Sequence, residues 1–278
     1  MRKFTIAGIA LFVDSDLEEY LPDRMSAFED DTALYLIGKP PLRVCIAEGL
    51  FCDINKTDSD ERILQQSWHG RLFEATFSPS TGMLLISKES MRQERSGIQF
   101  CLMQFIRVFI SQMLLRYGGF VLHASAVNTN RQALLFSGYS GIGKSTQARL
   151  WSMHDQASII NHDSPMIICC DGMFYACGNP WSGSDACYKQ ECVLVKCLVL
   201  LDKGMENRVY SASEREVVRF MLSQSLTSLL VASDVDLLIS NIQTFVSNTS
   251  VIRYSCKPDF SAIDTLKEYL IKEKILTC

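Results

Sequence analysis

Long uninterrupted apolar runs are scarce in this sequence of 278 residues. The most apolar stretch, CLMQFIRVFISQMLLRYGGF, is interrupted by Gln104, Arg107, Gln112 and Arg116. A membrane-spanning helix needs about 20 consecutive, mainly apolar residues. The interrupting residues recur at helical spacing, which predicts an amphipathic core helix over residues 98–117. We therefore expect no membrane partner.

The cysteines lack the spacing that metal sites and disulfide frameworks show. The sequence has no CxxC pair, and no histidine lies among the six cysteines of residues 169–197. The total of eleven is odd, and many lie inside apolar runs such as MIICC and CLVLL. Reduced thiols in the core of a cytoplasmic protein explain this pattern better than disulfides. A metal site is the weaker alternative.

An excess of one charge is also missing. The formal net charge is −4 and the pI is near 5.6, which argues against a nucleic-acid-binding surface over the whole protein. Apolar residues make up 47% and charged residues 21%, enough for a sizeable core in a soluble chain. The N-terminal MRKFTIAGIALFV resembles a signal peptide only faintly, since its apolar run is short and Asp14 follows. We interpret it as a first β-strand.

The pattern of elements predicts a mixed α/β fold (α+β mixed). Residues 1–96 form a β-rich N-terminal unit, with the strand candidates FTIAGIALFV, TALYLIG, LRVCIAE, RLFEATF and GMLLIS. We expect residues 97–278 to form a second domain, largely helical in its C-terminal part, to which the motifs described next assign nucleotide binding and catalysis. Its strand pairs FVLHASAV/ALLFSG and MIICC/MFYAC are separated by short turn-like segments, which predicts two hairpins.

A glycine-rich loop, GYSGIGKST at residues 138–146, follows the apolar run ALLFS and precedes a helical pattern. It matches the phosphate-binding pattern GxxxxGK[ST], whose glycines let backbone N–H groups turn toward phosphate oxygens. Lys144 would reach the β- and γ-phosphates, and the Ser145 hydroxyl would bind Mg²⁺. The loop predicts binding of ATP, or another nucleoside triphosphate, with Mg²⁺. The expected nucleotide-binding residues are Gly138, Tyr139, Ser140, Gly141, Ile142, Gly143, Lys144, Ser145 and Thr146.

Two acids compete for the metal-binding or catalytic position. Asp202 ends the apolar run CLVLL, as in the Walker B pattern, and Asp163 follows the strand candidate SIIN. Either carboxylate could hold Mg²⁺ or orient the attacking group. Asp202 could instead open the turn DKG, and Asp163 could be a cap beside Pro165.

Three motifs, HASAV, GYSGIGKS and INHDSP, together resemble the catalytic domain of HPr kinase/phosphorylase, which is related to ATP-dependent phosphoenolpyruvate carboxykinase. His123 precedes Lys144 by 21 residues, which matches the family's spacing. Asp163 matches the second Asp of the family's acidic motif, and His162 stands where the first would be. The stretch GNPWSG at residues 178–183 is similar to a bacterial branch often found among peptide-maturation genes.

The resemblance implies an ATP-dependent kinase that phosphorylates a hydroxyl, most simply Ser or Thr, of a peptide, small protein or metabolite. Lys144, Asp163 and His123 would be catalytic, Asp163 acting as the base or as a metal ligand with Ser145. His162, Trp181 and Ser182 are candidate substrate contacts. A homo-oligomer is a further possible assembly.

Departures from the family keep two alternatives open. The family's Glu metal ligand has no counterpart in the stretch NPWSGSD. The chain could therefore be a nucleotide-binding regulatory or scaffold protein with little catalysis. It could also be a conventional Walker-type NTPase that uses Asp202.

Overall fold

The computed structural model describes residues 1–29, 39–47, 60–183, 186–226 and 231–277. Its contacts divide the chain into two compact units, Met1–Met113 and Leu114–Cys278, which we describe separately. The sequence predicted a boundary at residues 96/97, ahead of the long helix. The observed division lies inside α2 (Arg95–Arg116). The start of α2 packs on the first unit's sheet, where a side chain at Gly97 would lie 2.6 Å from the Phe73 ring.

The first unit is built on a six-stranded mixed sheet, with the strand order β1-β2-β3-β6-β5-β4. Its strands are β1 (Arg2–Ile6), β2 (Ile9–Val13), β3 (Leu42–Ala47), β4 (Arg62–Trp68), β5 (Arg71–Ser78) and β6 (Met83–Ser87), with short helices α1 (Ser15–Glu18), η1 (Asp23–Phe28) and η2 (Ser90–Arg92). FTIAGIALFV, expected as one strand, is a hairpin, because Ala7 and Gly8 adopt positive φ angles and reverse the chain. β4 was not expected, and the candidate TALYLIG lies outside the described residues.

Helix α2 is the apolar element of this region. By length and composition it is apolar enough to cross a membrane, so the expectation that no segment would qualify is wrong. Two of the four interrupting residues are glutamines, which carry no charge. The helix therefore has too few charged side chains to be excluded as a membrane span. The helix is 72% buried over its most apolar window, and core helices of soluble proteins meet the same criteria.

The second unit contains a nine-stranded mixed sheet, ordered β10-β8-β9-β13-β12-β11-β7, with β15 beside β13 and β14 beside β15. The strands are β7 (Phe120–Val121), β8 (Ala124–Thr129), β9 (Gln132–Ser137), β10 (Ser158–Asn161), β11 (Met166–Cys170), β12 (Met173–Cys177), β13 (Cys192–Lys203), β14 (Arg208–Tyr210) and β15 (Ser250–Cys256). The helices are α3 (Lys144–His154), α4 (Glu214–Gln224), α5 (Ala232–Asn248) and α6 (Phe260–Lys272). Both expected hairpins, β8/β9 and β11/β12, are present.

Three parallel strands position the candidate site. β13 pairs in parallel with β9, where Leu200 lies opposite Ser137, and with β15, where Asp202 lies opposite Ser255. The C-terminal ends of β9, β13 and β15 therefore meet at one edge of the sheet. In open α/β sheets this is the edge at which ligands bind.

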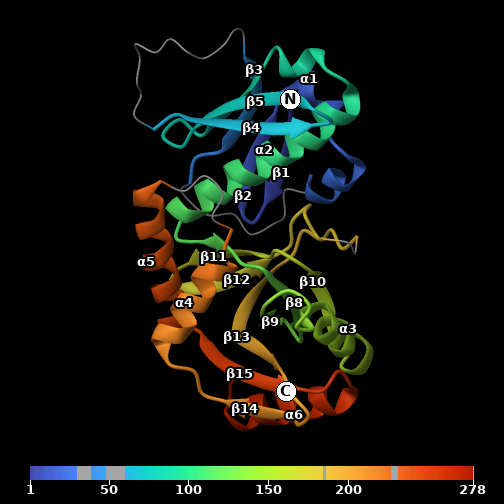
Figure 1. The fold of residues 1–278 in the computed structure, drawn as a ribbon, viewed down its shortest axis with the longest axis vertical. Helices are drawn as coiled ribbons and strands as arrows, with labels where there is room; N and C mark the ends of the chain where they lie inside the picture. The colour runs from blue at the N-terminus through green and yellow to red at the C-terminus, as the bar shows by residue number, and fades with distance from the viewer. Residues whose placement is uncertain (30–38, 48–59, 184–185, 227–230, 278) are drawn as a thin grey trace. The chain divides into compact units, whose positions relative to one another are not determined.

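Helices cover both faces of this part of the sheet, with α4 and α5 on one side and α3 and α6 on the other (Figure 1). Side chains of β13 alternate between the two layers, as the strand period requires. Leu198 and Leu200 belong to the core with α4 and α5, while Val199 and Leu201 belong to the core with α3 and α6. The parallel strands are thus buried on both faces, which explains their continuous apolar sequence.

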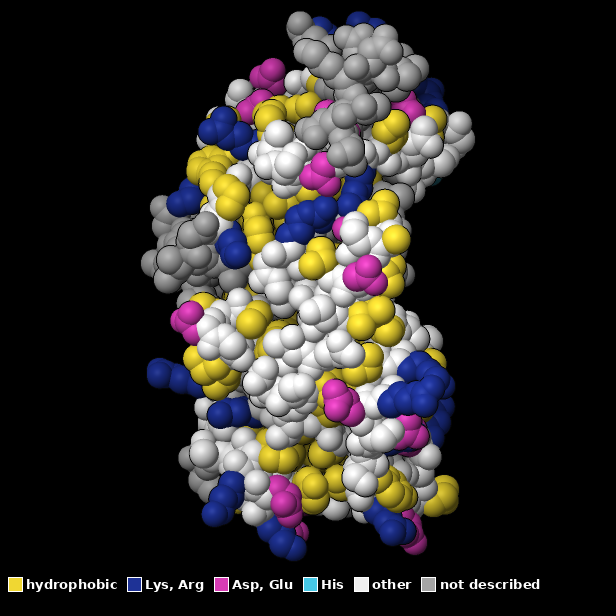
Figure 2. Space-filling model, turned by 90° about the vertical axis from the view of Figure 1, so that its left-hand side faces the viewer, with side chains coloured by type: hydrophobic (Ala, Val, Ile, Leu, Met, Phe, Trp, Pro, Cys, Tyr) yellow, Lys and Arg dark blue, Asp and Glu magenta, His cyan; other side chains and the backbone are white. Residues whose placement is uncertain are grey.

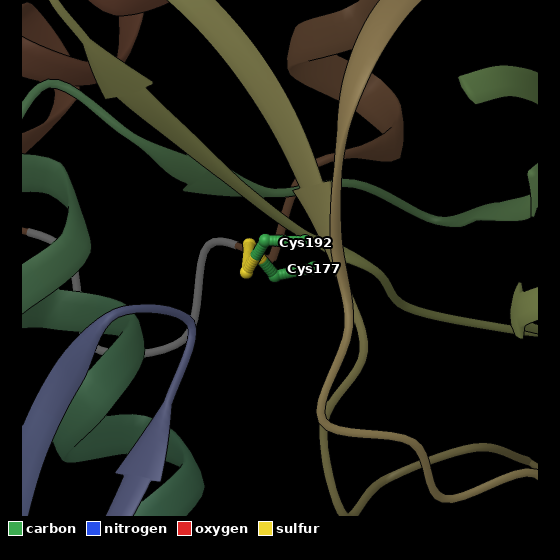
Figure 3. The surroundings of a disulfide bond; sticks show 2 residues. All are labelled: Cys177 and Cys192. Atoms are coloured by element: carbon green, nitrogen blue, oxygen red, sulfur yellow. A yellow bond between two sulfur atoms is a disulfide. The ribbon is translucent and has the colours of Figure 1, made fainter. Parts of the chain in front are cut away.

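A disulfide joins Cys177 of β12 to Cys192 of β13 (Figure 3). The expectation of reduced thiols throughout is therefore wrong for this pair. The two residues lie directly opposite each other on neighbouring antiparallel strands, with a Cα–Cα distance of 4.1 Å. Their sequence spacing carries no signal, because a long connection separates two strands that pair. Cytoplasmic localisation, which we inferred from reduced thiols, loses part of its basis and stays a prediction.

Charged side chains of both signs occur on the face of the molecule shown in Figure 2, where Lys and Arg are interspersed with Asp and Glu. Apolar side chains lie between them. This face agrees with the small net charge of the sequence.

Candidate active site

The glycine-rich loop joins the end of β9 to the start of α3 at Lys144. Gly141 and Gly143 have φ angles of 74° and 119°, in the left-handed region that favours glycine. Gly138 is needed for space instead, because a Cβ there would lie 2.6 Å from the Ile142 side chain. The strand, loop and helix therefore follow one another as the sequence predicted. The backbone turns at the two glycines bring the loop to the positive end of α3.

Lys144 is 7% exposed, and its ammonium is held by the loop itself. Nζ donates to the carbonyl oxygen of Gly138 at 2.9 Å and lies 3.5 Å from that of Tyr139. Burial lowers the pKa of Lys144, while the charge of Asp163 acts in the opposite direction. A partly desolvated cation at the N-terminus of a helix is suited to binding an anion.

Asp163 and His123 lie together beside the loop. The His123 Nε2 atom is 3.8 Å from Asp163 Oδ1, and both side chains are nearly half exposed. The backbone fixes both residues, since Ala124 N donates to Asp163 O at 3.1 Å and Ser137 Oγ donates to His123 O at 2.9 Å. The structure thus brings together the three residues predicted to be catalytic, Lys144, Asp163 and His123, from separate segments of the chain.

Two buried asparagines attach the segment that carries Asp163 to the GNPWSG segment. Asn161 Oδ1 accepts from the backbone N–H groups of Asp163 and Ser164, at 2.9 and 2.8 Å. Its Nδ2 donates to Trp181 O at 3.2 Å. Asn179 donates to Ser164 O at 2.8 Å and accepts from Trp181 N at 2.9 Å. We call these two residues the asparagine clamp; the sequence alone offered no signal for their pairing.

The three candidate substrate contacts have different environments. Trp181 and Ser182 are 7% and 2% exposed, so they line the interior of the unit rather than an open wall. The next residue, Gly183, lies so close to Asp163 that a Cβ would be 3.0 Å from the Asp163 Cβ. His162 is half-buried, and its carbonyl oxygen accepts from Ser125 Oγ at 2.7 Å. The GNPWSG segment therefore packs against Asp163 through Gly183.

Asp202 lies at the end of β13, the strand that runs parallel to β9. Its Oδ2 accepts from Arg253 Nε at 3.0 Å and lies 2.8 Å from Arg253 Nη2. This two-contact pairing holds the carboxylate with a fixed cation. Asp202 therefore lies where a Walker-type site would place its acid, at the end of the strand next to β9. Its carboxylate, however, is already paired with Arg253.

Among the described residues, no group of three or more His, Cys, Asp or Glu side chains could hold a metal ion. Mg²⁺ in phosphate-transfer sites does not require such a cage, because water and substrate phosphates supply most of its ligands. Ser145, half-buried in the first turn of α3, and Asp163 are oxygen donors of the kind Mg²⁺ prefers. The residues present fit a magnesium ion that arrives with a nucleotide.

A cavity of about 310 Å³ lies between the glycine-rich loop and the ends of β13 and β15. Gly141, Ile142, Gly143, Thr146 and Gln147 form the part of its lining that comes from the loop and α3. The remaining lining residues follow or end β13 and β15; they are Lys203, Gly204, Cys256, Lys257 and Pro258. The predicted nucleotide-binding residues include the first part except Gln147. They include none of the second part, because parallel pairing joins positions far apart in the chain.

No family model and no curated protein matches the chain. A solved structure similar to it is the HPr(Ser) kinase/phosphatase from Coxiella burnetii. The sequence identity is 10%, the match covers 55% of this chain and 98% of that one, and the TM-score is 0.33. This is a distant structural likeness.

Proposed function

We propose that the chain is a phosphotransferase that moves the γ-phosphoryl group of Mg·ATP to a hydroxyl of a peptide, small protein or small metabolite. One observation carries the proposal. Lys144, in the glycine-rich loop, interacts electrostatically with Asp163, whose carboxylate lies 3.8 Å from His123 Nε2. A cation suited to phosphate and a carboxylate suited to a hydroxyl proton thus share one site.

On the donor side, the loop and Lys144 hold the phosphates. The backbone N–H groups near Gly141 and Gly143 and the start of α3 face the negative charge, and the Lys144 ammonium moves from the loop carbonyls to the β- and γ-phosphate oxygens. Ser145 and Asp163 would hold Mg²⁺, which would supply neutralisation of the charge on the transferring group.

On the acceptor side, Asp163 orients the hydroxyl and takes its proton. As the new O–P bond forms, the bond between the γ-phosphorus and the bridging oxygen breaks, ADP leaves, and the hydroxyl proton goes to the Asp163 carboxylate. His123 orients Asp163 through the 3.8 Å contact. Positioning and charge neutralisation supply most of the rate in such reactions.

A second candidate, a Walker-type NTPase, is favoured by the place of Asp202 beside the loop strand. Leu200 of β13 lies opposite Ser137, so Asp202 comes two residues beyond the end of the pairing with β9. Its pairing with Arg253 argues against a direct metal ligand, because the guanidinium already neutralises the carboxylate. We therefore rank this candidate below the kinase.

Labelled ATP tests the proposal directly. The chain is incubated with Mg²⁺, γ-labelled ATP and small serine-containing peptides encoded by neighbouring genes, and phosphate gain is followed by mass. We expect transfer by the wild type and none by Lys144→Ala. Asp163→Asn should lower the rate by roughly 10²–10⁴-fold, the usual contribution of a general base, while ATP still binds.

The control is Asp171→Asn, an exposed carboxylate in the β11/β12 turn whose positive φ angle asparagine tolerates. It should transfer at the wild-type rate. Normal transfer by Asp163→Asn would reject the base assignment. Loss of turnover in Asp202→Asn, with Asp163→Asn unaffected, would establish the Walker-type alternative instead.

A further inference from the structure

Gln147 is a buried amide that the mechanism above does not use. It lies in the second turn of α3, is 2% exposed, and lines the cavity beside the loop. Its Nε2 donates to Cys256 Sγ at 3.2 Å. Its Oε1 has no hydrogen-bond partner among the described residues. A buried acceptor without a partner costs free energy, and nearly all such atoms in folded proteins are paired. The free oxygen therefore points to a donor on a ligand.

The place of the cavity indicates which part of a ligand would enter it. One side is formed by the loop glycines and Thr146, which would hold the phosphates. The other side is formed by the ends of β13 and β15, away from Asp163 and His123. A nucleotide whose phosphates lie on the loop, with its γ-phosphate toward Asp163, directs its nucleoside into the cavity. The volume of about 310 Å³ is within the usual range for small-ligand sites.

The contact with Cys256 orients the amide. With Nε2 directed to the sulfur, Oε1 is the atom left for the ligand. The site therefore presents an acceptor and prefers a base edge that presents a donor.

We infer that Gln147 selects the nucleobase of the phosphoryl donor, its Oε1 accepting a hydrogen bond from the exocyclic amino group of adenine. The inference rests on the proposed function, because it assumes that the loop binds a nucleoside triphosphate. Guanine and hypoxanthine carry a carbonyl oxygen at the corresponding ring carbon, which would face Oε1 as a second acceptor. Discrimination of this kind is strong when a buried polar group would otherwise stay unpaired.

The inference is tested by calorimetry on the wild-type chain, which gives the dissociation constants of three nucleotides. These are ATP, inosine triphosphate and purine riboside triphosphate, the last of which lacks the amino group. We expect ATP to bind about tenfold or more tightly than either analogue. Gln147→Leu should remove most of that preference, and Gln147→Glu, which keeps an oxygen at the site, should retain it. Equal affinities for the three nucleotides in the wild type would overturn the inference.

Binding of inorganic tripolyphosphate and a control variant distinguish a failure of this inference from a failure of the proposed function. Inorganic tripolyphosphate has no base, so it should bind the wild type and Gln147→Leu equally. If tripolyphosphate binds but the three nucleotides bind equally, the inference about Gln147 fails and the proposed phosphate site is retained. If neither tripolyphosphate nor ATP binds, the inference and the proposed function both fail. The matched control is Gln132→Leu, a buried glutamine bonded at both amide atoms to the Thr277 backbone, which should lose stability and keep the preference for ATP.

Discussion

At the residue scale, the proposed donor site depends most on Lys144. Its place in the GKS pattern predicts contact with the phosphates. The catalytic roles of Asp163 and His123 are predictions that come from the resemblance of their motifs to the HPr kinase/phosphorylase domain. Gln147 was not predicted, since a glutamine in a helix usually faces solvent. The role proposed for it depends on β15, which brings Cys256 Sγ within 3.2 Å of its Nε2.

We expect the lowered pKa of Lys144 to make the proposed nucleotide binding sensitive to pH. Only the protonated amine attracts phosphate, so affinity is complete well below the folded-state pKa. It is lost as the pH rises through that value, which burial places below the ordinary 10.5. Bound phosphate favours the charged form, so binding in this window takes up a proton.

Dissociation constants for Mg·ATP between neutral pH and about pH 10 test this prediction. Lys144→Arg, whose guanidinium stays protonated throughout, should lose the dependence. A wild-type affinity that does not change across the range would show that the Lys144 ammonium contributes nothing to binding.

At the element scale, the asparagine clamp holds two loops in register. The segment after β10 and the segment after β12 are joined by the hydrogen bonds of Asn161 and Asn179. The disulfide lies at the base of the second loop, between the ends of β12 and β13. The sequence predicted β10 and β12, the strands that precede the two loops. It could not predict their attachment, because side-chain amides that bond to backbone have no periodic pattern.

Asn179→Ala should affect both stability and turnover. It removes the hydrogen bonds of Asn179 to Ser164 O and Trp181 N, which should lower the free energy of unfolding by roughly 2–5 kcal/mol. The position of Asp163 becomes less defined, so kcat should fall while the dissociation constant for ATP changes little. Urea unfolding and steady-state kinetics measure the two effects.

The control for the clamp is Asn241→Ala. Asn241 donates to Leu115 O and Gly119 O, at 2.8 and 3.1 Å, away from the loops around Asp163. This variant should lose comparable stability and keep its kcat per folded molecule. A parallel fall of kcat in both variants would mean that the clamp acts through stability alone.

At the scale of the whole molecule, the sequence predicted a mixed α/β chain with a β-rich first part, and the structure has mixed sheets in both units. The hairpins followed from turn residues, as at Asp171-Gly172, where both φ angles are positive. The observed boundary between the units could not be predicted from the sequence. It lies inside α2, whose helical pattern runs without a break across Met113. The parallel pairing of β13 with β9 and β15 could not be predicted either, since it joins segments far apart in the chain.

The central claim is that the glycine-rich loop of the second unit binds a nucleoside triphosphate through Lys144. Isothermal titration of the full chain with Mg·ATP, beside the Lys144→Ala variant, tests it most directly. We predict one site per chain in the wild type and an affinity at least about tenfold weaker in Lys144→Ala, as expected for a lost charged contact. Absence of binding by the wild type, or equal affinity in the two proteins, would contradict the claim.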